Sequence, residues 1–114
     1  MQICQSYIGG KSWPSSQPPI DKFYAATGEV IAQVEPATAE MLDEAVTIAN
    51  EAQRGWAALE AGQRGEILQR AATLMRTHND ELARLEVMDV GKCFGEAVSA
   101  DVPSGPDALA YFAA

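Results

Sequence analysis

The stretch EVIAQVEPATAEML, residues 29–42, contains the point at which the chain changes from strand to helix. In its first half, apolar Val30, Ala32 and Val34 occupy every second position, and this period of two is typical of a β-strand. From Thr38 onward, apolar residues recur at steps of three and four, which is the helical period. Because the strand patterns lie before this point and the helical patterns after it, the sequence predicts an α+β fold.

Two β-hairpins are expected before Thr38, formed by residues 5–8 with 11–13 and by residues 20–25 with 29–34. Gly9 and Gly10 separate the first two segments, and glycine readily adopts the positive φ angles that tight hairpin turns require. Gly28 is the expected left-handed residue of the second turn. Residues 14–19 contain three prolines, which cannot donate to a β-ladder, so this segment is predicted to be a loop.

About four helices are expected after the strands. The first begins at Thr38, a favourable N-cap residue. It carries one apolar stripe, made of Leu42, Ala45, Ile48, Ala49, Ala52 and Trp56. Gly62 is expected to interrupt the helical pattern, and a second helix is predicted over residues 63–77.

The third predicted helix has Asn79 as its cap and ends near Gly91, which suits the left-handed position after a helix. Its buried residues are expected to include Leu82, Leu85 and Met88. A last helix is predicted over residues 106–113, with Pro106 in its first turn. The large aromatic side chains Trp13, Trp56, Tyr111 and Phe112 are expected to belong to the core.

Composition and charge exclude several classes of function. The formal net charge is −8, whereas proteins that bind nucleic acids or anionic membranes present basic patches. No apolar run approaches the roughly 20 residues that a membrane-spanning helix needs. The first residues lack a basic region followed by an apolar core, so no signal peptide is expected and the cytoplasm is the predicted location.

Few residues offer catalytic chemistry. Cys93 follows the predicted end of the third helix, where the helix dipole disfavours a thiolate, and Cys4 has no base or ligand spacing around it. His78 is the only histidine and is expected to be a surface or capping residue. No Gly-x-Gly-x-x-Gly or Walker-type loop opens a helix. The sequence therefore predicts no catalytic and no cofactor-binding residue.

Four spaced motifs carry a family resemblance: YIGGKSW at 7–13, ATGEVIA at 26–32, RGEIL at 64–68 and ELARLEVMDVGK at 81–92. Their order and spacing resemble the N-terminal portion of an aldehyde dehydrogenase. Within that superfamily, YAATGE at 24–29 and ADVPSG at 100–105 are most similar to bacterial betaine aldehyde dehydrogenases. The resemblance implies that residues 1–114 are part of the N-terminal, cofactor-domain segment, without the dinucleotide-binding sheet.

The resemblance also implies a monovalent-cation site. In the family, the aspartate matching Asp89 contributes to such a site, and a backbone carbonyl before the turn that matches residues 24–29 completes part of it. The carbonyl donors would be Phe23 and Lys22, and oxygen ligands suit a hard cation. At least one further family ligand lies beyond residue 114, so the site would be incomplete in this chain. The alternative is that Asp89 pairs with Lys92 or accepts local backbone hydrogen bonds.

As an implication of the resemblance, the full-length parent oxidises an aldehyde to its carboxylate, with NAD(P) as hydride acceptor and K⁺ bound. The family's nucleophilic cysteine, general-base glutamate and cofactor-binding strands come after the matched region, so no activity and no cofactor are expected for these 114 residues alone. Two alternatives remain open. The chain is a non-catalytic domain that associates with a full-length homologue or with itself, or it is a truncated remnant.

Overall fold

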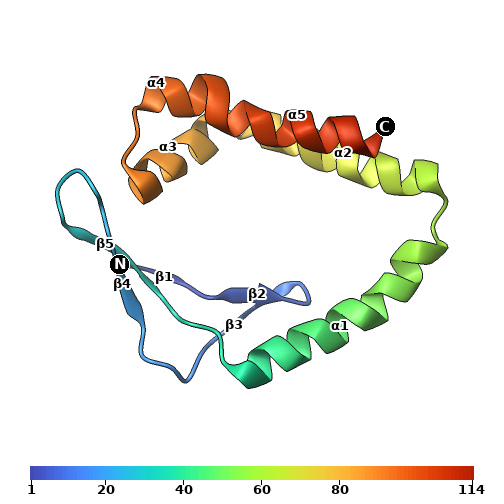
Figure 1. The fold of residues 1–114 in the computed structure, drawn as a ribbon, viewed down its shortest axis with the longest axis horizontal. Coiled ribbons are helices and arrows are strands. Elements are labelled where there is room, and N and C mark those ends of the chain that lie inside the picture. The colour runs from blue at the N-terminus through green and yellow to red at the C-terminus, as the bar shows by residue number, and fades with distance from the viewer. The chain divides into compact units, whose positions relative to one another are not determined.

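The computed structural model describes residues 1–114, and the chain forms two compact units, Met1–Ala58 and Leu59–Ala114. The first unit holds all five strands and the first helix, and the second unit is entirely helical. Figure 1 shows this order of elements along the chain. The predicted α+β class, with short strands followed by helices, is confirmed.

A three-stranded sheet organises the first unit. Strands β4 (Ile20–Phe23) and β5 (Val30–Val34) form the predicted antiparallel pair, and Gly28 in their turn has a φ of +75°. The sequence analysis missed β1 (Gln2–Cys4), which pairs in parallel with β5 and gives the order β1-β5-β4. Ala32, in the central strand, is one of the few buried side chains of this unit.

The other predicted hairpin is also present. Strands β2 (Ser6–Ile8) and β3 (Lys11–Trp13) pair in antiparallel fashion, with Gly9 at φ +60° and Gly10 at φ +83° between them. The Trp13 indole N–H donates to the carbonyl of Ile8 at 2.9 Å, which ties the two strands together from one side.

Helix α1 (Ala39–Ala58) begins as predicted at Thr38, whose hydroxyl oxygen accepts a hydrogen bond from the N–H of Met41 at 3.1 Å. The predicted apolar stripe is only partly correct. Ile48 packs near Gly9 of the hairpin, where an added Cβ would lie 3.4 Å from the Ile48 side chain. Leu42, however, points into solvent, and its neighbour Met41 is buried in its place.

Helix α2 (Ala61–Thr77) starts earlier than expected. Gly62 lies inside its first turn and does not interrupt the helix. The reason is a capping box: Glu60 accepts from the backbone at Gln63, and the Gln63 side chain accepts from the Glu60 N–H at 3.0 Å. Two otherwise unsatisfied donors are thereby bonded, which offsets the low helix propensity of glycine.

Helix α3 (Asn79–Val90) ends at Gly91 as predicted, with φ +77° in the left-handed region. The predicted cap is wrong by one residue: His78 occupies the N-cap position, and the Asn79 side chain donates to the Val98 carbonyl at 2.9 Å. The expected burial of Leu85 and Met88 is also wrong, since both are exposed and Ala83 is buried instead. The side chain of Ala83 is small, so it allows the neighbouring helical segments to pack closely against α3.

The last helical segment is longer than predicted. Helix α4 (Phe94–Glu96), a π-helical turn η1 (Ala97–Asp101) and α5 (Val102–Ala113) follow one another without a break. In the π-helical turn the Val102 N–H bonds to the Ala97 carbonyl five residues before it, and Val102 lies directly before Pro103, which has no N–H to donate. Because α5 begins at Val102, the prediction that Pro106 lies in the first turn of a helix over residues 106–113 is wrong, and Pro106 lies inside α5.

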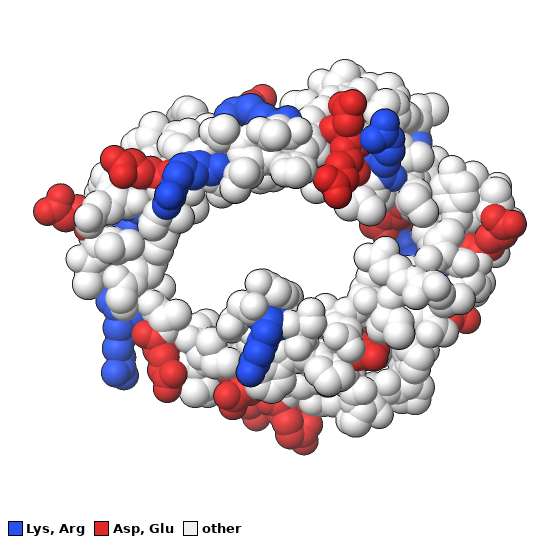
Figure 2. All heavy atoms as spheres, turned by 180° about the vertical axis from the view of Figure 1, so that it is seen from behind, with Lys and Arg blue, Asp and Glu red and all other residues white.

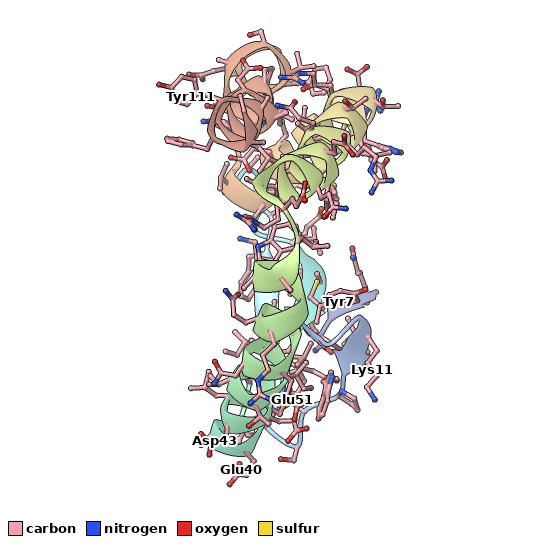
Figure 3. All side chains as sticks on the ribbon, turned by 90° about the vertical axis from the view of Figure 1, so that its right-hand side faces the viewer. Tyr7, Lys11, Glu40, Asp43, Glu51 and Tyr111 are labelled. Carbon is pink, nitrogen blue, oxygen red and sulfur yellow. The ribbon has the colours of Figure 1, made fainter.

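Helices α2 and α5 pack side by side in antiparallel fashion (Figure 1). Ala72 is fully buried, Gln69 donates to the Ala110 carbonyl at 2.8 Å, and Arg76 pairs with Asp107 at 3.0 Å. The expectation that Tyr111 and Phe112 are core residues is wrong. Their exposed fractions are 77% and 83%, and Figure 3 shows Tyr111 projecting from α5.

Candidate functional site

Asp89 lies in the last turn of α3, two residues before the Gly91 cap. The Gly91 N–H donates to the Val87 carbonyl at 2.8 Å and closes the helix. Carbonyl groups at a helix C-terminus carry partial negative charge, so a carboxylate in this turn is electrostatically unfavourable by itself. The position therefore suits a carboxylate that interacts with a positively charged or hydrogen-bond-donating group.

Asp89 also borders a groove in the second unit. Two adjoining hollows of about 480 and 380 Å³ share Met75, Leu82 and Leu85 as lining residues. The larger one extends along α5 to Val102 and Gly105, and the carboxylates of Glu86, Asp89 and Asp101 also line it. We call this feature the α3 groove; its apolar residues are Leu74, Met75, Leu82, Leu85, Val102 and Gly105.

Lys92 is held by Asp101 in an ion pair of 2.5 Å between Nζ and Oδ2. Hydrogen bonding to Asp101 raises the pKa of the Lys92 ammonium above 10.5, and the negative charges of Asp101, Glu96 and Glu86 act in the same direction. The Oδ2 atom is itself shielded from solvent. This pair joins the segment after α3 to the end of the π-helical turn and gives Lys92 a partner other than the predicted Asp89.

The predicted carbonyl donors Phe23 and Lys22 lie in β4 of the first unit. The β4–β5 register shifts between them, because Lys22 pairs with Ala32 whereas Phe23 pairs with Val30. Ile31 is the extra residue of this irregularity. Such bulges interrupt the hydrogen-bond ladder and change the direction of backbone groups. This interruption lies between the two residues that are predicted to supply carbonyl ligands.

The structure thus brings Asp89 together with Glu86 and Asp101, whereas Phe23 and Lys22 belong to the other unit. No group of three or more His, Cys, Asp or Glu side chains is arranged to hold a metal ion. Sequence reasoning missed Glu86 and Asp101 as neighbours of the site. Glu86 precedes Asp89 by three residues and could have been found from helical spacing, whereas Asp101 reaches the groove only through the π-helical turn.

The residues with nucleophilic or basic side chains lie elsewhere. Cys93 is exposed and follows the C-terminal end of α3, as predicted, and it also occupies the N-cap position of the short helix α4. Cys4 is half-buried at the end of β1. His78 contacts Glu81 at 3.0 Å on the surface, in agreement with the prediction of a surface or capping residue.

Figure 2 shows acidic and basic side chains interspersed on the face that it presents, with no continuous basic patch. The helices are also too short or too polar for any of them to cross a lipid bilayer.

Comparison with known proteins identifies the family. The aldehyde dehydrogenase family model matches residues 13–114. A betaine aldehyde dehydrogenase from Mesorhizobium japonicum is 43% identical over 107 residues, which are 93% of this chain and 22% of that protein.

Solved structures agree with this match. A gamma-glutamyl-gamma-aminobutyraldehyde dehydrogenase from Burkholderia cenocepacia has a TM-score of 0.91 at 33% identity, over 96% of this chain and 23% of its own. A point mutant of betaine aldehyde dehydrogenase from Staphylococcus aureus, in complex with NAD⁺, has a TM-score of 0.88 at 30% identity, over 96% and 22%. The chain spans about a fifth of the length of these relatives. On sequence and fold together, the chain belongs to the aldehyde dehydrogenase family.

Proposed function

We propose that residues 1–114 form the N-terminal segment of an NAD(P)-dependent betaine aldehyde dehydrogenase of the cytoplasm. The observation that carries this proposal is the 43% identity to the Mesorhizobium japonicum betaine aldehyde dehydrogenase, which extends over 93% of the chain. The parent enzyme oxidises the aldehyde to its carboxylate. Within it, this segment supplies structural support and no reacting group.

The proposal includes a monovalent cation in the parent, bound in part by the Asp89 carboxylate and by the carbonyls of Phe23 and Lys22. Two observations support it. The Asp89 carboxylate lies in the last turn of α3, where the partial negative charge of the helix end favours a nearby cation. The strand irregularity at Lys22 and Phe23 interrupts the ladder at the two predicted carbonyl donors. Further ligands would come from outside the matched region.

A second candidate is a non-catalytic domain that associates with a full-length homologue or with a second copy of itself. Exposed apolar side chains on both units favour it, among them Ile20, Phe23, Leu74 and Phe112. A truncated remnant without a function is the third reading; it predicts that unfolding of the chain is not cooperative.

One experiment separates these proposals: isolation of the native polypeptide that carries this sequence, followed by its intact mass and its assay with betaine aldehyde and NAD⁺ or NADP⁺. A mass several times 12.2 kDa, with formation of NADH or NADPH, is the expected result. Replacing K⁺ by choline at equal ionic strength should lower the thermal midpoint of that protein, and Asp89→Asn should abolish the difference. A native mass near 12.2 kDa would contradict the dehydrogenase proposal and favour the binding domain or the remnant.

A further inference from the structure

The π-helical turn leaves the backbone carbonyl of Val98 without a helical donor. In an α-helix this carbonyl would accept from the Val102 N–H, but that N–H donates to the Ala97 carbonyl. A π-helical bond to Val98 would have to come from residue 103, which is a proline and has no N–H. The donors that the α and π registers offer to Val98 are therefore taken in one case and absent in the other.

The side chain of Asn79 supplies the missing donor. Its Nδ2 atom donates to the Val98 carbonyl at 2.9 Å, from a position nineteen residues earlier in the chain. The contact is partly buried, and a carbonyl that is shielded from water is costly to leave unpaired. Although Asn79 is the first residue of α3, its amide thus bonds to another helical segment and not to the start of its own helix.

An unbroken α register through residues 97–101 is the alternative conformation of this segment. It would return the Val102 N–H to the Val98 carbonyl. The ring of Pro103 would then press against the carbonyl of Ser99, four residues before it, and that carbonyl would have no donor. Each register therefore leaves one carbonyl without a backbone partner, and the amide of Asn79 reaches the one that the π register leaves.

The register of the turn sets the direction of Asp101. This residue is the last of the π-helical turn, and its carboxylate holds Lys92 at 2.5 Å and lines the α3 groove. Successive residues of an α-helix are rotated by about 100° about the helix axis, and those of a π-helix by less. A change of register would therefore rotate the Asp101 side chain relative to the end of α3.

We propose that Asn79 is a positioning residue of the candidate site: it holds residues 97–101 in the π register and thereby keeps Asp101 against Lys92. Pro103 is the second part of this device, because it makes the α register unfavourable. The inference rests on contacts within the second unit and is independent of the substrate of the parent enzyme.

The test is amide hydrogen exchange of the native polypeptide that carries this sequence, followed by mass spectrometry of peptides that cover residues 94–105. Asn79→Asp keeps the size of the side chain, and its charge suits the first turn of α3, but a carboxylate cannot donate. Gln69→Glu is the matched control. It makes the same change of charge and removes an amide donor from the carbonyl of Ala110, which belongs to the same helical segment.

Asn79→Asp should raise the exchange rate of this segment at least about tenfold, because an unsatisfied carbonyl favours local opening. Gln69→Glu should leave that rate unchanged. Pro103→Ala makes the α register available, so adding Asn79→Asp to Pro103→Ala should raise the rate less than about twofold. A wild-type rate in Asn79→Asp, or the same increase in both backgrounds, would overturn the proposal, because a contact that only packs α3 would be lost equally in both.

A crystal structure of the double variant Asn79→Asp, Pro103→Ala tests the positioning of Asp101 directly. The expected result is a Val102 N–H that donates to the Val98 carbonyl, and a Lys92 Nζ that lies more than about 4 Å from the Asp101 carboxylate, beyond the reach of an ion pair. A retained π register, or an α register in which Lys92 still pairs with Asp101, would contradict the proposal.

Discussion

At the scale of single residues, Lys92 shows how a local reading of charge can identify the wrong partner. Sequence spacing offered Asp89 as its counterion, three residues away at the end of a helix. In the structure, Lys92 pairs with Asp101, nine residues later, because the π-helical turn brings the Asp101 carboxylate back toward the end of α3. Each side chain of the pair is only 32% exposed, so the pair is better shielded than Arg76–Asp107, whose side chains are 48% and 69% exposed.

We expect Lys92→Met to lower the free energy of unfolding more than Arg76→Met. The Arg76–Asp107 pair is the more exposed of the two, and exposed pairs contribute about 0.2–1 kcal/mol at most. The pH dependence of the free energy of unfolding distinguishes the Lys92–Asp101 pair from the Arg76–Asp107 pair. Since the folded-state pKa of Lys92 is raised above 10.5, its stabilisation is fully present below pH 10.5 and is lost as the pH rises through the folded pKa. Arg76 stays protonated throughout. Urea unfolding of the three proteins between neutral and strongly alkaline pH measures both differences, and a Lys92→Met deficit that persists at the highest pH would contradict this account.

At the scale of elements, two glycines of α2 have opposite roles that their sequence does not reveal. A Cβ on Gly65 would lie 2.6 Å from the backbone oxygen of Ala113 in α5, whereas a Cβ on Gly62 would meet nothing within 4 Å. We expect Gly65→Ala to destabilise the chain by about 1–3 kcal/mol, because it forces two backbones apart. Gly62→Ala should stabilise it by up to about 1 kcal/mol through helix propensity. Equal effects in thermal unfolding would show that α2 and α5 do not approach so closely.

The elements that sequence reasoning identified correctly depend on local rules. Gly28 and Gly91 have positive φ as predicted, because the turn and the helix end use a backbone conformation that glycine adopts readily and that residues with a Cβ rarely adopt. The errors depend on partners far away in the chain. Strand β1 exists only because it pairs with β5, about thirty residues later, and three residues carry no period by themselves. The candidate site shows the same division: Asp89 was found from a motif, whereas its neighbour Asp101 depends on the π-helical turn.

At the scale of the whole molecule, net charge and exposed apolar surface act against each other. The chain carries a charge of −8 near neutral pH, and its isoelectric point is about 4.4. Its fully buried apolar side chains are few and small, while large ones such as Tyr111 and Phe112 stay in solvent. Charge repulsion between molecules therefore keeps apart surfaces that would otherwise associate.

We expect self-association of the 114-residue chain to increase as the pH falls from 7 toward about 4.4, because the repulsion disappears while the apolar surface remains. The double variant Tyr111→Ser, Phe112→Ser should associate less at every pH. The two rings contact each other edge to face, with 5.1 Å between centroids, and are mostly exposed, so their removal should leave the thermal midpoint nearly unchanged. Static light scattering and thermal unfolding of both proteins measure these outcomes. If the double variant associated as strongly as the wild type near the isoelectric point, the apolar contacts between molecules would have to lie elsewhere, and the exposed leucines of the α3 groove would be the next residues to replace.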